Sequence, residues 1–225
     1  MKRKPILILF ATMALAVPLA AQMGMGQVPT LSGIFRPVVG SGAVYETTQQ
    51  QKGTKTTMDF AVIAKEDMGG KTGYWVESAI TSERGEVIVK VLETVDGNTI
   101  SYSKSVIQMP GQGPMEMDMT TMNMMGGRKN AQTNAADFRD KAELVGTESV
   151  TVPAGTFSCE HYRMKDGSGD GWISDKVSPW GLVKMQDSTR TTVLVKTISD
   201  AKDRITGTPT KFDPMQMMRN RTGQQ

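Results

Sequence analysis

Apolar and polar residues alternate with a period of two through most of the chain, and this pattern predicts β-strands. The clearest stripe lies in residues 86–95 and consists of Val87, Val89, Val91 and Val95. Because β-branched side chains fit a pleated surface, this segment favours a strand. Similar runs predict further strands at residues 43–50, 55–65, 72–81, 99–109, 143–152, 156–165, 172–174, 182–187 and 191–199.

Short turn-forming segments separate these strands. In Asp96-Gly97-Asn98, Gly and Asn tolerate positive φ, and in Pro153-Ala154-Gly155 the proline fixes φ for the start of a tight turn. Because a few residues join each strand to the next, neighbours are expected to be antiparallel and adjacent. About ten such strands with little helix predict an all-β fold, in which one strongly curved meander sheet forms an incomplete, half β-barrel.

A single domain is predicted over residues 34–206. Residues 22–33 are expected to be a flexible leader, and residues 207–225, which are polar and contain two prolines, a disordered tail. Residues 109–134 are rich in Gly, Met, Thr and Asn and are predicted to form a long loop within the domain. A short helix over residues 135–142 is expected to follow this loop.

The N-terminus has the pattern of a cleaved secretory signal peptide over residues 1–21. Three basic residues precede an apolar run at Ile6–Val17, which is too short to span a bilayer, and a small-residue exit ends at Ala21. The sequence therefore predicts a periplasmic or secreted protein without a transmembrane anchor in the mature chain. Because no cysteine lies near Ala21, no lipid-modified N-terminus is expected.

Removal of the signal peptide changes the net charge. The full chain has 26 Lys+Arg and 23 Asp+Glu, and residues 1–21 contain three of the bases and no acid, which leaves 23 of each in the mature chain. A nucleic-acid-binding surface depends on an excess of basic charge. The composition therefore argues against a nucleic-acid partner.

The second half of the chain resembles a known family. The matching residues are Gly146, Glu148, Val150, Val152-Pro153-Ala154-Gly155, Phe157, Cys159, Trp172 and Gly181-Leu182-Val183-Lys184. They are similar to a signature of exported bacterial proteins related to the lipoprotein-carrier and lipoprotein-receptor superfamily (LolA/LolB-like). The resemblance implies an incomplete β-barrel around an apolar cavity in which known members bind acyl chains. Unlike the carriers, this chain has a Met-rich segment where they have a helical lid, and it lacks the receptor's lipid anchor.

The leading hypothesis is an exported, non-enzymatic protein that binds an apolar ligand, such as a lipid or acyl chain, or a partner segment in a half-barrel groove. Burial of apolar surface would drive binding, at about 25 cal/mol per Å² before association costs. The candidate groove residues are Phe60, Val62, Val87, Val89, Val91, Trp172 and Trp180. For both tryptophans the alternative is structural packing at the end of the sheet. Another hypothesis is a structural subunit of an envelope complex.

Clustered methionines provide the alternative cofactor hypothesis, which is Cu(I) binding in the periplasm. Thioether sulfur is a soft ligand that selects Cu(I), and an M-x-M-x-M spacing places successive sulfurs on one side of an extended segment. The candidate ligands are Met115, Met117, Met119, Met122, Met124 and Met125. Two other interpretations of the segment are an adaptable apolar lid over a groove and compositional drift in a disordered loop.

Catalytic motifs are absent from the sequence. Cys159 is the only cysteine and His161 the only histidine, and as neighbours on one strand face they are poorly placed to act as nucleophile and base. Without a second cysteine no intramolecular disulfide can form, so Cys159 is expected to be a small buried side chain. No phosphate loop, dinucleotide fingerprint or HExxH motif occurs, and the sequence predicts no enzyme.

Overall fold

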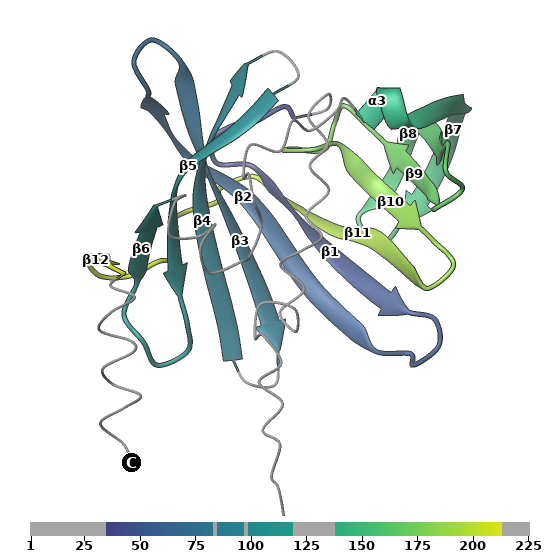
Figure 1. Ribbon diagram of the computed structural model, residues 1–225. Helices are drawn as coiled ribbons and strands as arrows, with labels where there is room; N and C mark the ends of the chain where they lie inside the picture. Colours follow the sequence, from purple (N-terminus) through teal and green to yellow (C-terminus); the bar gives the residue numbers. More distant parts are fainter. Residues whose placement is uncertain (1–34, 83–84, 97–98, 119–137, 213–225) are drawn as a thin grey trace, which may run out of the picture.

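The computed structural model describes residues 35–82, 85–96, 99–118 and 138–212, which form one open sheet of twelve strands and a four-residue helix (Figure 1). The first six strands are β1 (Gly42–Gln49), β2 (Lys55–Asp67), β3 (Thr72–Ser82), β4 (Gly85–Asp96), β5 (Thr99–Gln108) and β6 (Met115–Asp118). They are followed by α3 (Phe138–Lys141), β7 (Ala142–Val152), β8 (Gly155–Met164), β9 (Asp170–Ile173), β10 (Leu182–Gln186), β11 (Arg190–Ile198) and β12 (Thr210–Lys211).

The predicted all-β class and open, curved antiparallel sheet are confirmed. All ten predicted strands are present, and their ends fall within two residues of the predicted ones. The helix expected over 135–142 is shorter, because Ala142 already pairs with Met164 as the first residue of β7. The signal peptide (1–21), the leader (22–33), most of the Met-rich segment (119–134) and the end of the tail (213–225) lie outside the described residues.

Two meanders, β1–β6 and β7–β11, make up the sheet. Its strand order is β12-β6-β5-β4-β3-β2-β1-β11-β10-β9-β8-β7, so the first strand of one meander lies beside the last strand of the other. The antiparallel pairing of β1 with β11 extends from Gly42 opposite Ile198 to Gln49 opposite Arg190. Figure 1 shows β7–β10 on the far side of this junction from β2–β6. The two meanders are therefore joined through β1 and β11 into one open sheet, and β7 and β12 are its edge strands.

Two predictions of irregular structure are wrong in part. Strand β6 lies in the segment predicted to be a loop, and β12 lies in the predicted tail, where it pairs in parallel with β6. The backbone N–H of Phe212 donates to the carbonyl of Glu116 at 2.9 Å, and that of Thr210 donates to the carbonyl of Pro114 at 3.0 Å. These two short strands lie at one edge of the sheet and are held by backbone hydrogen bonds. An alternation of apolar and polar residues in the sequence does not reveal such bonds, so the strands were not predicted.

The two faces of the sheet differ in chemistry. Because directly opposite residues of antiparallel strands share a face, the register assigns each side chain to one of two sets. The face that bears Phe60 and Val89 is called the inner face, and the face that bears Asp59 and Glu77 is called the outer face. The main core lies on the inner face around β1, β2 and β11, and joins residues of both meanders. Its fully buried members include Ala43, Val183 and Leu194.

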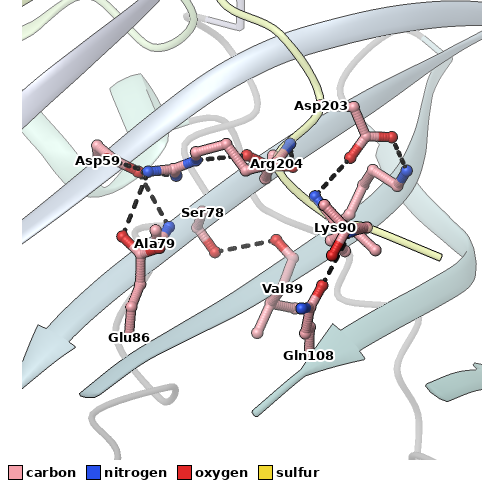
Figure 2. A network of polar contacts seen from close by, with 12 residues as sticks. Asp59, Ser78, Ala79, Glu86, Val89, Lys90, Gln108, Asp203 and Arg204 are labelled. Carbon is pink, nitrogen blue, oxygen red and sulfur yellow. Dashed lines mark hydrogen bonds and ion pairs between the residues drawn. The ribbon is translucent and has the colours of Figure 1, made fainter. Parts of the chain in front are cut away.

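A segment after β11 crosses the outer face of β2–β5, and we call residues 200–206 the strap (Figure 2). Arg204 donates from its guanidinium to Asp59 at 2.7 Å and to Glu77 at 2.8 Å, and Lys90 pairs with Asp203. Glu77 is completely buried, and burial raises the pKa of its carboxyl even though Arg204 acts in the opposite direction. The strap therefore supplies the charge that compensates a buried carboxyl in the middle of the sheet.

Candidate ligand pocket on the inner face

Five of the predicted groove residues share the inner face. Phe60 lies opposite Ser78, which lies opposite Val89, and Val62 lies opposite Val76, which lies opposite Val91. Val87 is two residues from Val89 and shares its side of β4. The period-two pattern thus grouped these five side chains on one face of the sheet, as the register shows.

Phe60 and Trp180 contact each other directly. Their ring centroids are 4.8 Å apart with an interplanar angle of 86°, which is an edge-to-face arrangement. Both side chains are more than nine-tenths buried within the main core, and Val62 is fully buried as well. At this end the inner face is filled by the protein's own side chains.

A second cluster occupies the inner face of β4, β5 and β6. Its buried members are Val89, Ile107 and Met117, and the partly buried side chains packed against them are Val87, Val91, Met109 and Phe212. Met115 lies opposite Ile107 and Met117 opposite Ser105, so the first two methionines of the predicted metal set share one face, where Met117 packs against apolar side chains. Met119, Met122, Met124 and Met125 lie outside the described residues, so the Cu(I) set as a whole stays a prediction.

Trp172 packs against the edge of the main core, which contains Phe60 and Trp180, but its polar and stacking contacts lie within β7–β10. Its ring stacks on His161 with centroids 4.5 Å apart, Lys184 lies over the ring, and its Nε1 donates to Glu148 at 2.5 Å. The two nitrogens of His161 lie 3.1 Å from Glu148 and 2.8 Å from Asp170. This cluster of stacked and ion-paired side chains fastens β7, β8, β9 and β10 to one another.

Cys159 and His161 have different surroundings. The Cys159 thiol is 1% exposed, belongs to the main core and donates to the carbonyl of Phe157 at 3.6 Å. Burial raises the pKa of Cys159 to about 11, which keeps the sulfur in its weakly nucleophilic thiol form at neutral pH. The two ring nitrogens of His161, in contrast, each lie close to a carboxylate, Glu148 or Asp170. The pair is therefore poorly suited to nucleophilic catalysis.

A pocket of about 370 Å³ opens between the segment before β1 and the adjoining ends of β3 and β4. Its lining residues are Phe35, Pro37, Lys71, Thr72, Tyr74, Val95 and Asp96. The ring of Phe35 lies 6.1 Å from both Tyr74 and Trp180, which connects the pocket wall to the main core. The exposed pair Lys71–Asp96, with Nζ and Oδ2 2.5 Å apart, provides the polar part of the lining.

Glu93 is not one of the lining residues, but it neighbours two of them on the sheet and has an unusual environment. It is directly opposite Tyr74 and two residues from Val95, so its side chain shares the inner face with two pocket-lining residues. The residue is 5% exposed, and within the described part of the chain its Oε2 atom has no hydrogen-bond partner. Burial raises the pKa of Glu93 to about 8, so the carboxyl is mainly protonated at neutral pH.

Tyr102 lies opposite Glu93 on β5. Burial, and secondarily the negative charge that Glu93 acquires on ionisation, raise the pKa of the Tyr102 hydroxyl above its usual range. The carboxyl thus lies between two tyrosines, Tyr74 and Tyr102, on adjacent strands. Sequence reasoning missed Glu93, although the signal was present: it is the one charged residue in phase with the valines of 86–95.

A second pocket, of about 330 Å³, lies where β8 and β9 meet the loop before β10. Cys159, Glu160, Tyr162 and Ser174 are among its lining residues, together with charged side chains such as Arg36 and Lys176. Both pockets combine polar and apolar side chains in similar proportion. The first pocket differs in that two aromatic rings, Phe35 and Tyr74, line it and connect it to the main core.

The described residues contain no cluster of three or more His, Cys, Asp or Glu side chains that could hold a metal ion. Within the same residues, no helix is both long enough and apolar enough to cross a bilayer. The pocket lining offers apolar side chains, which are Phe35, Pro37, Tyr74 and Val95, and polar ones, which are Lys71, Thr72 and Asp96. Such a set can bind and orient a molecule by packing and hydrogen bonding.

No family of known proteins matches the sequence, and no curated protein sequence matches it. Among solved structures, the chain is similar to a candidate lipoprotein from Parabacteroides distasonis, with 16% identity, a TM-score of 0.36, and coverage of 74% of this chain and 98% of the other. It is also similar to a candidate exported protein with a YmcC-like fold from Bacteroides fragilis, with 10% identity, a TM-score of 0.35, and coverage of 74% and 99%. At these TM-scores the similarity supports no inference about binding or mechanism.

Proposed function

We propose that the protein is an exported, non-enzymatic binding protein that holds an apolar ligand, such as a lipid acyl chain, in the pocket on the inner face. The observation that carries the proposal is the apolar part of the pocket lining, which includes Phe35, Tyr74 and Val95, and in which Phe35 also contacts Trp180 of the main core. A volume of about 370 Å³ falls among sites that take small molecules, which span about 300–1,000 Å³.

Several further features support binding over catalysis. The Cys159 thiol is buried and poorly ionised, and both nitrogens of His161 face carboxylates, which leaves neither free to activate a substrate. The signal-peptide pattern of residues 1–21 supports export. The partner we propose is thus a hydrophobic small molecule or lipid of the cell envelope, which an envelope protein could deliver or receive.

Displacement of a fluorescent fatty-acid probe from the mature chain, residues 22–225, tests this proposal. The wild-type chain is expected to bind the probe, and native mass spectrometry to detect co-purified lipid. Val95→Trp fills the pocket and should weaken probe binding at least about tenfold, a loss of about 1.4 kcal/mol. Val145→Trp is the matched control, because Val145 is 52% exposed on β7, and its affinity should equal that of the wild type.

Two results would contradict the proposal. One is the absence of both probe binding and co-purified lipid in a chain whose circular dichroism shows a folded β-sheet. The other is equal probe affinity in the Val95→Trp and Val145→Trp variants, which would place any apolar site elsewhere on the molecule.

A further inference from the structure

Two charged residues line the first pocket, and they form an ion pair with each other. Lys71 lies in the turn between β2 and β3, and its Nζ is 2.5 Å from Oδ2 of Asp96, the last residue of β4. The two side chains are 60% and 69% exposed, so the pair borders solvent. Asp96 directly follows Val95 of the apolar lining. A molecule that packs its hydrocarbon part against Val95 therefore places its polar end near the pair.

This ion pair can exchange its partners at little cost. Exposed pairs contribute little to stability, because water solvates both separated charges well. The local backbone is also held by other contacts. The carbonyl of Lys71 accepts from the backbone N–H of Met68 at 2.8 Å, and the backbone N–H of Gly70 donates to Asp67 at 2.8 Å. Opening of the pair therefore leaves the turn and the ends of the strands in place.

The balance of charge in the lining determines which head group fits. Of the described residues that line this pocket, Lys71 is the only cation and Asp96 the only anion. A head group with a single charge is attracted by one of them and repelled by the other, so the two effects largely cancel. An uncharged head group gains no ion pair. A head group with one positive and one negative charge replaces the single pair by two.

We propose that the Lys71–Asp96 pair selects zwitterionic amphiphiles. Lys71 binds the anionic group of the head group, such as a phosphate, and Asp96 binds its ammonium group, while the hydrocarbon part packs against Phe35, Tyr74 and Val95. The inference rests on the proposed function and narrows its ligand class to amphiphiles with both charges on one head group. Because both new pairs border solvent, dissolved salt screens them.

Isothermal titration calorimetry of the mature chain at pH 7 tests this selection. The ligands share a twelve-carbon chain and are used below their micelle concentrations: lauroyl lysophosphatidylethanolamine is zwitterionic, dodecyl phosphate anionic, dodecylamine cationic and monolauroylglycerol uncharged. Wild type is expected to bind the zwitterion about three- to fivefold more tightly than each of the others, which is the effect of one additional exposed ion pair. This preference should decrease in 1 M NaCl, a concentration of about 1 M being enough to screen exposed charges within a few ångströms.

Charge variants separate the two residues of the pair. Asp96→Asn leaves Lys71 unopposed, so the preference should change to dodecyl phosphate, and Lys71→Gln should change it to dodecylamine. The double variant Lys71→Asp/Asp96→Lys retains both charges and should retain the preference for the zwitterion. Lys55→Gln is the matched control, because Lys55 forms an exposed pair with Glu46 at 2.8 Å and does not line the pocket. Its four affinities should equal those of wild type.

Two results would overturn the selection while leaving the proposed function intact. One is equal affinity of wild type for all four ligands, which would mean that the hydrocarbon chain alone is recognised. The other is an unchanged order of affinities in both Asp96→Asn and Lys71→Gln. Failure of all four ligands and of the fluorescent probe to bind wild type would instead overturn the proposed function.

Discussion

At the scale of single residues, the buried carboxyl of Glu93 makes the stability of the folded chain depend on pH. Burial raises its pKa from an ordinary value of 4.5 to about 8. Between these values the folded chain binds a proton that the unfolded chain releases, so the free energy of unfolding decreases as pH rises. The stabilising contribution of the neutral carboxyl is complete below about pH 4.5, decreases as the pH rises from about 4.5 to 8, and is lost above about pH 8.

Glu93→Gln is expected to remove this contribution to the pH dependence. Between pH 5 and pH 8 the wild-type free energy of unfolding should fall, relative to the variant, by on the order of 3 kcal/mol. Urea denaturation followed by tryptophan fluorescence at several pH values measures this difference. Glu143→Gln, which removes an exposed carboxyl, should follow wild type. Parallel wild-type and Glu93→Gln curves would show that Glu93 titrates normally in the folded chain.

Glu93 also shows how far residue-scale reasoning from the sequence could reach. Its position in phase with Val87, Val89 and Val91 is readable from the period of two, and it could have been predicted to point inward. Its unpaired state depends on Tyr74 and Tyr102, which lie opposite it only because of the register of β3 and β5. Register is set by the assembled sheet, and alternation within one strand does not determine it.

At the scale of elements, the strap shows how an irregular segment can stabilise a regular one. Arg204 contacts Asp59 on β2, Glu77 on β3 and Glu86 on β4, so one guanidinium binds three neighbouring strands. Glu77 is fully buried, whereas Arg204 retains 36% side-chain exposure. Removal of the guanidinium would leave the Glu77 carboxyl buried without this cationic partner, although the Arg204 backbone N–H would still donate to it.

Arg204→Met is expected to lower the free energy of unfolding by about 3 kcal/mol, because it leaves a buried acid without its charged partner. Arg163→Met is the matched control: Arg163 pairs with Asp170 at the surface, with 58% side-chain exposure, and its loss should change stability by less than about 1 kcal/mol. Urea denaturation measures both. The double variant Arg204→Met/Glu77→Gln should recover part of the loss, since it removes the buried acid. If Arg204→Met and Arg163→Met lowered the free energy of unfolding equally, the ion pair between the strap and Glu77 would not stabilise the fold more than a surface pair does.

The elements themselves were largely predictable, and the exceptions have a common physical cause. Long strands with aliphatic side chains on the inner face, such as β4, are predictable because apolar and polar residues alternate along them. Strand β6 has the same alternation in Met115-Glu116-Met117-Asp118, but it lies in a Met- and Gly-rich segment that lacks aliphatics. Strand β12 consists of Thr210 and Lys211 and is held by backbone pairing to β6, which leaves no hydrophobic pattern to read.

At the scale of the whole molecule, the decisive feature is the junction of the two meanders. Local turn signals predict that each strand pairs with the next, and this holds within β1–β6 and within β7–β11. The pairing of β1 with β11 joins residues about 150 positions apart, such as Tyr45 and Leu194, and has no local signal. The contact between Phe60 and Trp180 likewise depends on this junction. The main core therefore exists only when both meanders are folded.

This arrangement predicts that the two meanders unfold together in one transition. Trp75 on β3 reports on the first meander, whereas Trp172 on β9 and Trp180 report on the second. In a variant that retains only Trp75, through Trp172→Phe and Trp180→Phe, the fluorescence and circular dichroism midpoints in urea should coincide. They should also coincide in the Trp75→Phe variant.

Leu194→Ala strengthens the test, because Leu194 is fully buried on β11 at the junction. Its truncation is expected to destabilise the chain by about 2–5 kcal/mol, with a cavity left in the shared core. Added to each tryptophan variant, it should shift the Trp75 signal on the first meander as much as the Trp172 and Trp180 signals on the second. A shift confined to the second meander, or a separate Trp75 transition, would mean that β1–β6 folds as an independent unit and that the junction couples the halves only weakly. A common shift would mean that the pocket lined by Phe35, Tyr74 and Val95 is folded only when the contacts of β11, on the other side of the sheet junction, are also formed.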